Sequence, residues 1–132
     1  MHQTILIIDF GSQYTQLIAR RLRELNVYCE IHPYNHLPEI SDTIKGVIFS
    51  GSPFSVRDTQ APFFDTKSFF GKTPVLGLCY GAQMLAHQNQ GEVVASKIRE
   101  YGRAKLATVD HHNELLKEIP VDTQVWMSHA DT

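Results

Sequence analysis

Apolar runs alternate with amphipathic segments along the first third of the chain. Thr4–Asp9 is a continuous apolar run that ends in an acid, which is typical of a strand buried on both faces of a parallel sheet. From Tyr14 to Leu25 the apolar residues recur at helical spacing, with charged residues largely between them, and this pattern predicts an amphipathic helix. Ser12 can cap the start of that helix, and Asn26 is a plausible left-handed stop.

The same alternation continues to about residue 91. Three further apolar runs predict strands at Val27–His32, Gly46–Ser50 and Val75–Leu78. A helix is expected over Gly81–Gln90, closed by Gly91. Weaker patterns favour strands at Glu92–Ser96, Ala104–Val109 and Thr123–Met127. Strands that alternate with helices predict an α/β fold, with an open, mainly parallel sheet flanked by helices. No linker-like stretch divides the chain, so we expect residues 1–132 to form a single domain.

Three turns of chemical interest follow strands of this expected sheet. They are Asp9–Ser12, Ser50–Pro53 and Cys79–Gly81. Ligands of open parallel sheets bind beyond the carboxyl ends of the strands, and those ends meet at one edge. We therefore expect the three turns to face one crevice.

Cys79 lies where a short buried strand runs directly into a helix, between Gly77 and Gly81. Small residues on both sides permit a strained turn, and this Gly-x-Cys-x-Gly pattern is typical of a nucleophile elbow with cysteine as the nucleophile. The alternative is a buried, inert cysteine beside two turn glycines. Cys29 alternates with Val27 and Ile31 on one strand face, so we expect it to be buried and unreactive.

A thiolate that attacks an amide needs hydrogen-bond donors for the developing oxyanion. The backbone amide of Tyr80 and the turn at Gly51 and Ser52 are the candidates, although that turn can also be a plain end of a strand. Gln83 lies one helical turn beyond Cys79 and can face the same crevice, the alternative being an exposed helix residue.

The nucleophile also needs a base, usually a histidine oriented by a carboxylate. His87 is eight residues past Cys79 on the same helix, about 12 Å away, which is too far. His111 and His112 fall in a polar turn, whereas His129 follows an apolar strand and can reach the crevice. No His-x-Glu pair occurs near the end of the sequence, so we expect the base to lie outside residues 1–132.

Composition narrows the class of protein further. The net charge of −2 gives no electrostatic case for nucleic-acid binding, and no apolar run approaches the roughly 20 residues that span a membrane. The first residues lead directly into a strand, and the two cysteines lie far apart, which favours a cytoplasmic protein with free thiols. No cluster has zinc-ligand spacing and no phosphate-binding Gly-x-x-x-x-Gly-Lys-Ser/Thr loop occurs, so we expect no metal or cofactor here.

Three segments carry a family resemblance. Gly77–Gln83 resembles the nucleophile motif of the class I glutamine amidotransferases, and Asp9–Leu17 resembles the opening signature of the GMP synthetase branch of that family. Val125–Asp131 resembles the Val-Trp-Met-Ser-His-Gly-Asp segment of the same branch. Together the segments span the chain nearly end to end. The resemblance implies a flavodoxin-like fold of three layers, cut inside the amidotransferase domain.

The resemblance also implies roles for individual residues. Cys79 would attack the side-chain amide of glutamine, with the oxyanion bound by the backbone at Gly51 and Tyr80. The residues that would hold glutamine are Ser52, Gln83, Ser128, His129 and Asp131. The triad histidine and glutamate would lie beyond residue 132. Two positions depart from the pattern, since Ser52 stands where a second glycine is common and Ala130 replaces the glycine of Ser-His-Gly-Asp.

Partners and cofactors follow from the same resemblance. Ammonia would pass to a synthetase (ATP-pyrophosphatase) domain of the same polypeptide, which aminates XMP to GMP with ATP and Mg²⁺. A homodimer would form through a C-terminal region beyond residue 132. Without that synthetase domain and the triad base, the isolated fragment is expected to be almost inactive. Two alternatives stay open. One is a different class I amidotransferase, of the anthranilate or carbamoyl-phosphate type, and the other is a non-catalytic module that binds glutamine or a partner.

Overall fold

The computed structural model describes residues 3–62, 64–69 and 72–131. The chain divides into two compact units, Met1–Val93 and Val94–Thr132, and each is described by itself. The expectation of a single domain over residues 1–132 therefore stays a prediction.

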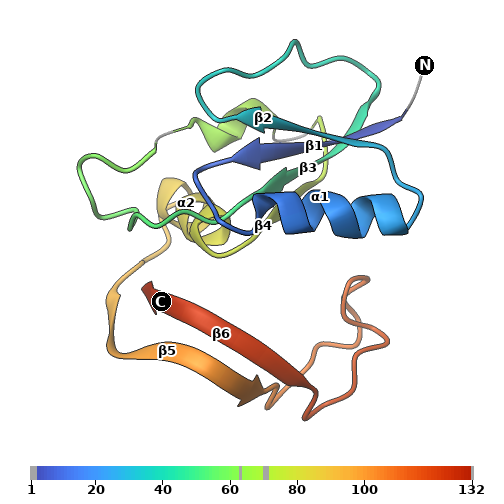
Figure 1. Cartoon of the computed structure of the whole chain (residues 1–132). Helices are drawn as coiled ribbons and strands as arrows, with labels where there is room; N and C mark the ends of the chain where they lie inside the picture. Colours follow the sequence, from blue (N-terminus) through green and yellow to red (C-terminus); the bar gives the residue numbers. More distant parts are fainter. Residues whose placement is uncertain (1–2, 63, 70–71, 132) are drawn as a thin grey trace. The chain divides into compact units, whose positions relative to one another are not determined.

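A four-stranded parallel sheet forms the centre of the first unit (Figure 1). The strands β1 (Thr4–Asp9), β2 (Cys29–Pro33), β3 (Ile44–Phe49) and β4 (Val75–Gly77) lie in the order β2-β1-β3-β4. Every pair is parallel, so the expected parallel sheet is confirmed. Within β1, three consecutive apolar residues, Leu6, Ile7 and Ile8, are fully buried. A strand of this kind has protein on both faces, as its continuous apolar run predicts.

One face of the sheet carries α1 (Thr15–Glu24), whose apolar stripe packs around Ile7, Ala19 and Cys29. The helix ends at Glu24, and two residues later Asn26 takes a left-handed φ of 60°, as expected. The expectation that Ser12 caps the helix is wrong. The helix begins three residues later, and the Ser12 hydroxyl instead accepts a hydrogen bond from the Tyr14 amide at 3.0 Å. A wider turn, with Gly11 at a φ of 96°, separates the strand from the helix.

The opposite face carries the short 3-10 helix η1 (Thr66–Phe69) and α2 (Tyr80–Gln88). Their buried side chains join the buried residues of this face of the sheet in one cluster: Leu6, Ile8, Phe10, Val47, Phe49, Phe69, Tyr80 and Met84. Two helical layers around one sheet give the expected three-layer arrangement in this unit.

The end of α2 differs from the expectation in one detail. Gln90, and not Gly91, takes the left-handed backbone, with a φ of 69°. Gly91 is needed for another reason. Its backbone amide donates to the Ala86 carbonyl at 2.7 Å, and at this close approach a Cβ would lie only 2.8 Å from that oxygen.

The second unit is an antiparallel pair of strands, β5 (Ala95–Lys105) and β6 (Gln124–Asp131). The separate strands expected at Glu92–Ser96 and Ala104–Val109 are wrong, because one long strand spans the gap between them. The intervening residues 97–103 are mostly charged or polar and so gave no apolar signal, yet residues 100–103 pair through their backbones with β6. Pairing in a two-stranded ribbon needs backbone groups and not a buried face.

Candidate active site

Cys79 occupies the turn between β4 and α2, with a φ of 51° and a ψ of −114°. Non-glycine residues rarely adopt such a backbone, and its persistence requires support from the surrounding structure. The thiol is exposed, whereas Cys29 is 6% exposed and its sulfur lies 3.6 Å from the Ala19 carbonyl oxygen. The strained elbow expected at Cys79 and the burial expected of Cys29 are both confirmed.

The two glycines beside Cys79 permit close packing of α2 on the sheet. A Cβ at Gly81 would lie 2.6 Å from the Cβ and carbonyl oxygen of Phe49, and one at Gly77 would lie 2.8 Å from the Ala82 backbone. Neither glycine is among the positive-φ residues, so the strain of the turn is carried by Cys79 itself. The glycines thus allow helix and strand to approach closely enough to hold the elbow.

The expected meeting of three turns is confirmed. A Cβ built on Gly51 would lie 3.5 Å from the Cβ of Cys79 and 3.6 Å from the hydroxyl oxygen of Ser12. A Cβ on Gly11 would lie 3.6 Å from the Pro53 ring. The turns after β1, β3 and β4 therefore lie side by side at the carboxyl edge of the sheet, where ligands of such sheets bind.

Sequence reasoning missed Ser50, the residue that joins these turns. It is fully buried, and its hydroxyl accepts the Phe10 amide at 2.9 Å while donating to the Gly51 carbonyl at 3.0 Å. Its backbone amide donates to the Ile8 carbonyl, and its carbonyl accepts the Gly81 amide, both at 3.1 Å. The only signal in the sequence is a small polar residue directly after a buried strand.

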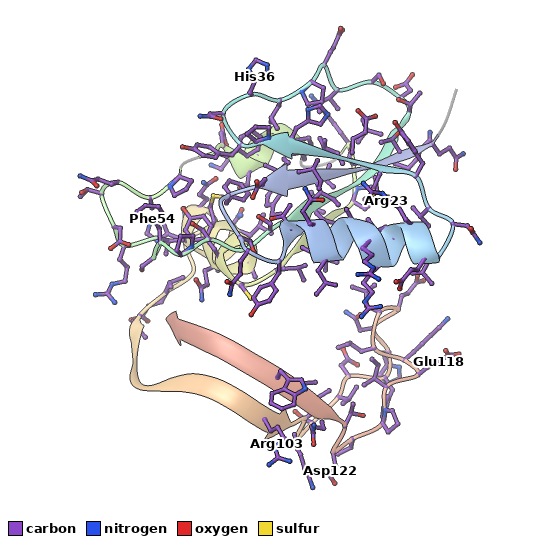
Figure 2. The ribbon with its side chains drawn as sticks, viewed as in Figure 1. Arg23, His36, Phe54, Arg103, Glu118 and Asp122 are labelled. Atoms are coloured by element: carbon purple, nitrogen blue, oxygen red, sulfur yellow. The ribbon has the colours of Figure 1, made fainter. Side chains whose placement is uncertain are left out.

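Tyr80 links the elbow to the loop that follows the Gly51 turn. Its ring is buried, 5.7 Å from the Phe10 ring, and its hydroxyl donates a hydrogen bond to the Pro62 carbonyl. Burial, with smaller contributions from Tyr34 and Asp58, raises the pKa of the Tyr80 phenol above 10.0. Figure 2 shows Phe54 on this same loop. The side chain of Tyr80 thus acts in packing, while its backbone amide begins α2.

Two expected glutamine-binding residues belong to the first unit, one in the turn after β3 and one in the first turns of α2. Ser52 is half-buried, and its hydroxyl accepts the Phe54 amide at 3.2 Å. Among the described residues Ser52 is not one with a left-handed φ, so a serine fits where a glycine is common. The backbone amide of Gln83, one turn into α2, donates to the Cys79 carbonyl at 3.0 Å.

The remaining expected residues belong to β6. They are Ser128, His129 and Asp131. Their backbones pair, in that order, with Tyr101, Glu100 and Ala95 of β5, but their side chains lie outside the described residues. Ala130, the second departure from the family pattern, lies in the same strand and likewise has no described side chain.

Across residues 3–62, 64–69 and 72–131, no group of three or more His, Cys, Asp or Glu side chains is arranged to hold a metal ion. None of the helices in those ranges has the length and apolar character needed to cross a bilayer.

Comparisons with known proteins agree with this geometry. A sequence model of the family described as "Glutamine amidotransferase class-I" matches residues 6–132. The chain is 63% identical over 132 residues to GMP synthase [glutamine-hydrolyzing] of Cytophaga hutchinsonii and 57% identical to that of Phocaeicola vulgatus. In both cases the match covers 100% of this chain and 26% of the relative, so the chain spans about a quarter of the length of these relatives.

Solved structures give the same picture. A Thermoplasma acidophilum protein described as one subunit of a GMP synthase superimposes with a TM-score of 0.76 and 30% identity, over 99% of this chain and 66% of that protein. A glutamine amidotransferase of Methylobacillus flagellatus superimposes with a TM-score of 0.72 and 23% identity, over 100% of this chain and 57% of that protein. The second likeness concerns the fold alone.

Proposed function

This chain belongs to the class I glutamine amidotransferase family, and on that premise we propose that it carries the nucleophile side of a glutaminase site serving a GMP synthase. The observation that carries the proposal is the exposed Cys79, strained at the start of α2 and beside the Gly51 turn. An exposed thiol beside small-residue turns can receive a substrate amide, whereas the inert alternative requires burial.

The proposed chemistry is an acyl transfer through Cys79. Its sulfur forms a bond to the amide carbon of the glutamine side chain, and the carbonyl oxygen becomes an oxyanion. Backbone amides at Tyr80 and Gly51 stabilise that charge, and the N-terminus of α2 favours the negative charge on sulfur. Collapse of the intermediate breaks the carbon–nitrogen bond and releases ammonia. Water then cleaves the thioester to give glutamate and regenerate the thiol.

The remaining parts of the site belong to the proposal. Ser52, Gln83, Ser128, His129 and Asp131 would hold the amino-acid end of glutamine. A histidine and a glutamate beyond residue 132 would move the protons, since a cysteine nucleophile requires a base oriented by a third group.

The assignment to a GMP synthase is supported by relatives of that name that are 52–63% identical over the whole of this chain. In this proposal a synthetase domain of the same polypeptide receives the ammonia and aminates XMP to GMP with ATP and Mg²⁺. The proposal also includes homodimerisation through a C-terminal region beyond residue 132 and a cytoplasmic location, with both cysteines free. The anthranilate and carbamoyl-phosphate types of amidotransferase are the alternative.

Covalent labelling tests the nucleophile. The full-length protein is treated with a diazo-ketone analogue of glutamine, and the adduct is mapped by mass spectrometry. We expect one adduct, on Cys79, with Cys29 unmodified and no labelling in a Cys79→Ala variant. An adduct on Cys29 with Cys79 intact would overturn the assignment. Glutamine-dependent amination of XMP, measured on the same preparation, separates the GMP synthase from the other amidotransferases.

A further inference from the structure

We propose that Ser50 is a positioning residue of the glutaminase site, and that its side-chain hydroxyl holds the Gly51 turn and the turn after β1 in register with the Cys79 elbow. The proposal rests on the glutaminase function proposed above. Ser50 itself faces the protein interior and is fully buried, so it acts through its neighbours and not on the substrate.

The hydroxyl of Ser50 joins two turns that are distant in sequence. As an acceptor it takes the amide hydrogen of Phe10, 40 residues earlier, at 2.9 Å, and as a donor it bonds the Gly51 carbonyl at 3.0 Å. The second bond fixes the orientation of the peptide group that follows Gly51. It therefore constrains the turn that lies beside Cys79.

The backbone of Ser50 ties the same residue to the elbow. Its carbonyl accepts the amide of Gly81, two residues after the nucleophile, at 3.1 Å, and its own amide continues the ladder to Ile8 at 3.1 Å. Substitution leaves these backbone bonds in place, so a side-chain variant isolates the contribution of the hydroxyl. That contribution is the alignment of the proposed oxyanion donors with the attacking sulfur.

The expected effect of Ser50→Ala falls on catalysis more than on binding. The variant leaves the amide of Phe10, a residue that is 2% exposed, without its partner, and it frees the carbonyl of Gly51 to turn. A displacement of about 1 Å in a catalytic arrangement can cost about 10²-fold in rate. We expect kcat for glutamine hydrolysis to fall about 10- to 100-fold, with KM changed by less than about threefold, because donors aligned with the transition state act on kcat.

Thr66 supplies a matched control within the same unit. It is also fully buried, and its hydroxyl also makes a hydrogen bond, to the Gln88 side chain at 2.8 Å. Gln88 lies at the far end of α2, about 13 Å along the helix axis from Cys79. Thr66→Ala therefore removes a buried hydroxyl of the same kind from the same domain without touching the turns.

The experiment compares wild type, Ser50→Ala, Ser50→Thr and Thr66→Ala in the full-length protein. Glutamine hydrolysis is measured as kcat and KM, Cys79 labelling by the diazo-ketone as a rate, and folding by circular dichroism at the assay temperature. We expect slower turnover and slower labelling only in Ser50→Ala, with activity restored by the hydroxyl of Ser50→Thr. Equal kcat values in Ser50→Ala and Thr66→Ala overturn the proposal. A Ser50→Ala protein that is unfolded at every temperature tested also overturns it, because the hydroxyl would then be needed for folding. Absence of hydrolysis by the wild type would instead contradict the proposed function.

Discussion

A methyl group at Gly81 should misplace the nucleophile. The Cβ of an alanine at this position would lie 2.6 Å from both the Cβ and the carbonyl oxygen of Phe49, well inside the 3.4 Å at which ordinary contact begins. Phe49 cannot retreat easily, because it is fully buried and its ring packs against Phe10, Phe64 and Phe69. The start of α2 must therefore move away from β3, and Cys79 moves with it.

The size of this effect can be estimated from the contact. A clash of that depth requires a shift on the order of 1 Å, and such a displacement costs about 10²-fold in rate. Overpacking costs about 1–3 kcal/mol of stability, offset by up to about 1 kcal/mol because alanine favours the helix more than glycine does. The expected net destabilisation is therefore about 1–2 kcal/mol, and the loss of activity is the larger effect.

The assay compares Gly81→Ala with Gly91→Ala in the full-length protein. A Cβ at Gly91 would also clash with backbone, 2.8 Å from the Ala86 carbonyl oxygen, but it lies beyond the other end of α2. Both variants should lose stability in urea denaturation, while only Gly81→Ala should lose ammonia release from glutamine and labelling of Cys79. Wild-type turnover in a folded Gly81→Ala protein would refute the reasoning that close packing of α2 on Phe49 positions the thiol.

Three other predictions follow from local contacts. The difference between the spectrophotometric titrations of the wild type and of Tyr80→Phe should show a phenol that ionises above pH 10.0, because burial raises the pKa of Tyr80. The stability that the neutral phenol contributes is fully present below pH 10.0 and is lost as the pH rises through the folded-state pKa. A titration midpoint at or below pH 10.0 would contradict the raised pKa. Asn26→Ala should cost about 1 kcal/mol in urea denaturation, because Asn26 has a φ of 60°, whereas Asn26→Gly should be nearly neutral; equal stabilities would exclude left-handed strain as the cause. Asp9→Ala should cost about 1–3 kcal/mol, because one carboxylate oxygen accepts both the Gly11 amide and the Thr15 hydroxyl, and Asp9→Asn should retain most of that stability.

Part of the candidate site could be predicted from residues that are close together in the chain. The pattern around Cys79, a short strand followed by a cysteine between two glycines, predicts an elbow. It does so because these features set the backbone conformation of only a few consecutive residues. The meeting of three turns also followed from sequence, since parallel strands bring their carboxyl ends to one edge. Roles for Ser128, His129 and Asp131 remain predictions that rest on the family resemblance, because their side chains lie outside the described residues.

Other features could not be predicted from the apolar pattern. Ser12 looked like a helix cap, yet the wider turn at Gly11 moved the start of α1 to Thr15. The long β5 had no apolar signal between its ends, because its pairing with β6 uses backbone groups.

The sequence by itself determined the class of this protein: buried parallel strands, an elbow cysteine and the motifs of an amidotransferase family. Hydrophobic burial and backbone conformation set these features locally, and so they can be recognised residue by residue. Only the tertiary structure decided how the site is held. The hydroxyl of Ser50 meets Phe10 across 40 residues, and Gly81 fits against Phe49 across 32, through hydrogen bonds and contacts that exist only once the strands have assembled. Directional bonds and close packing between distant segments leave no periodic pattern in the sequence, so their contribution is visible only in the folded chain.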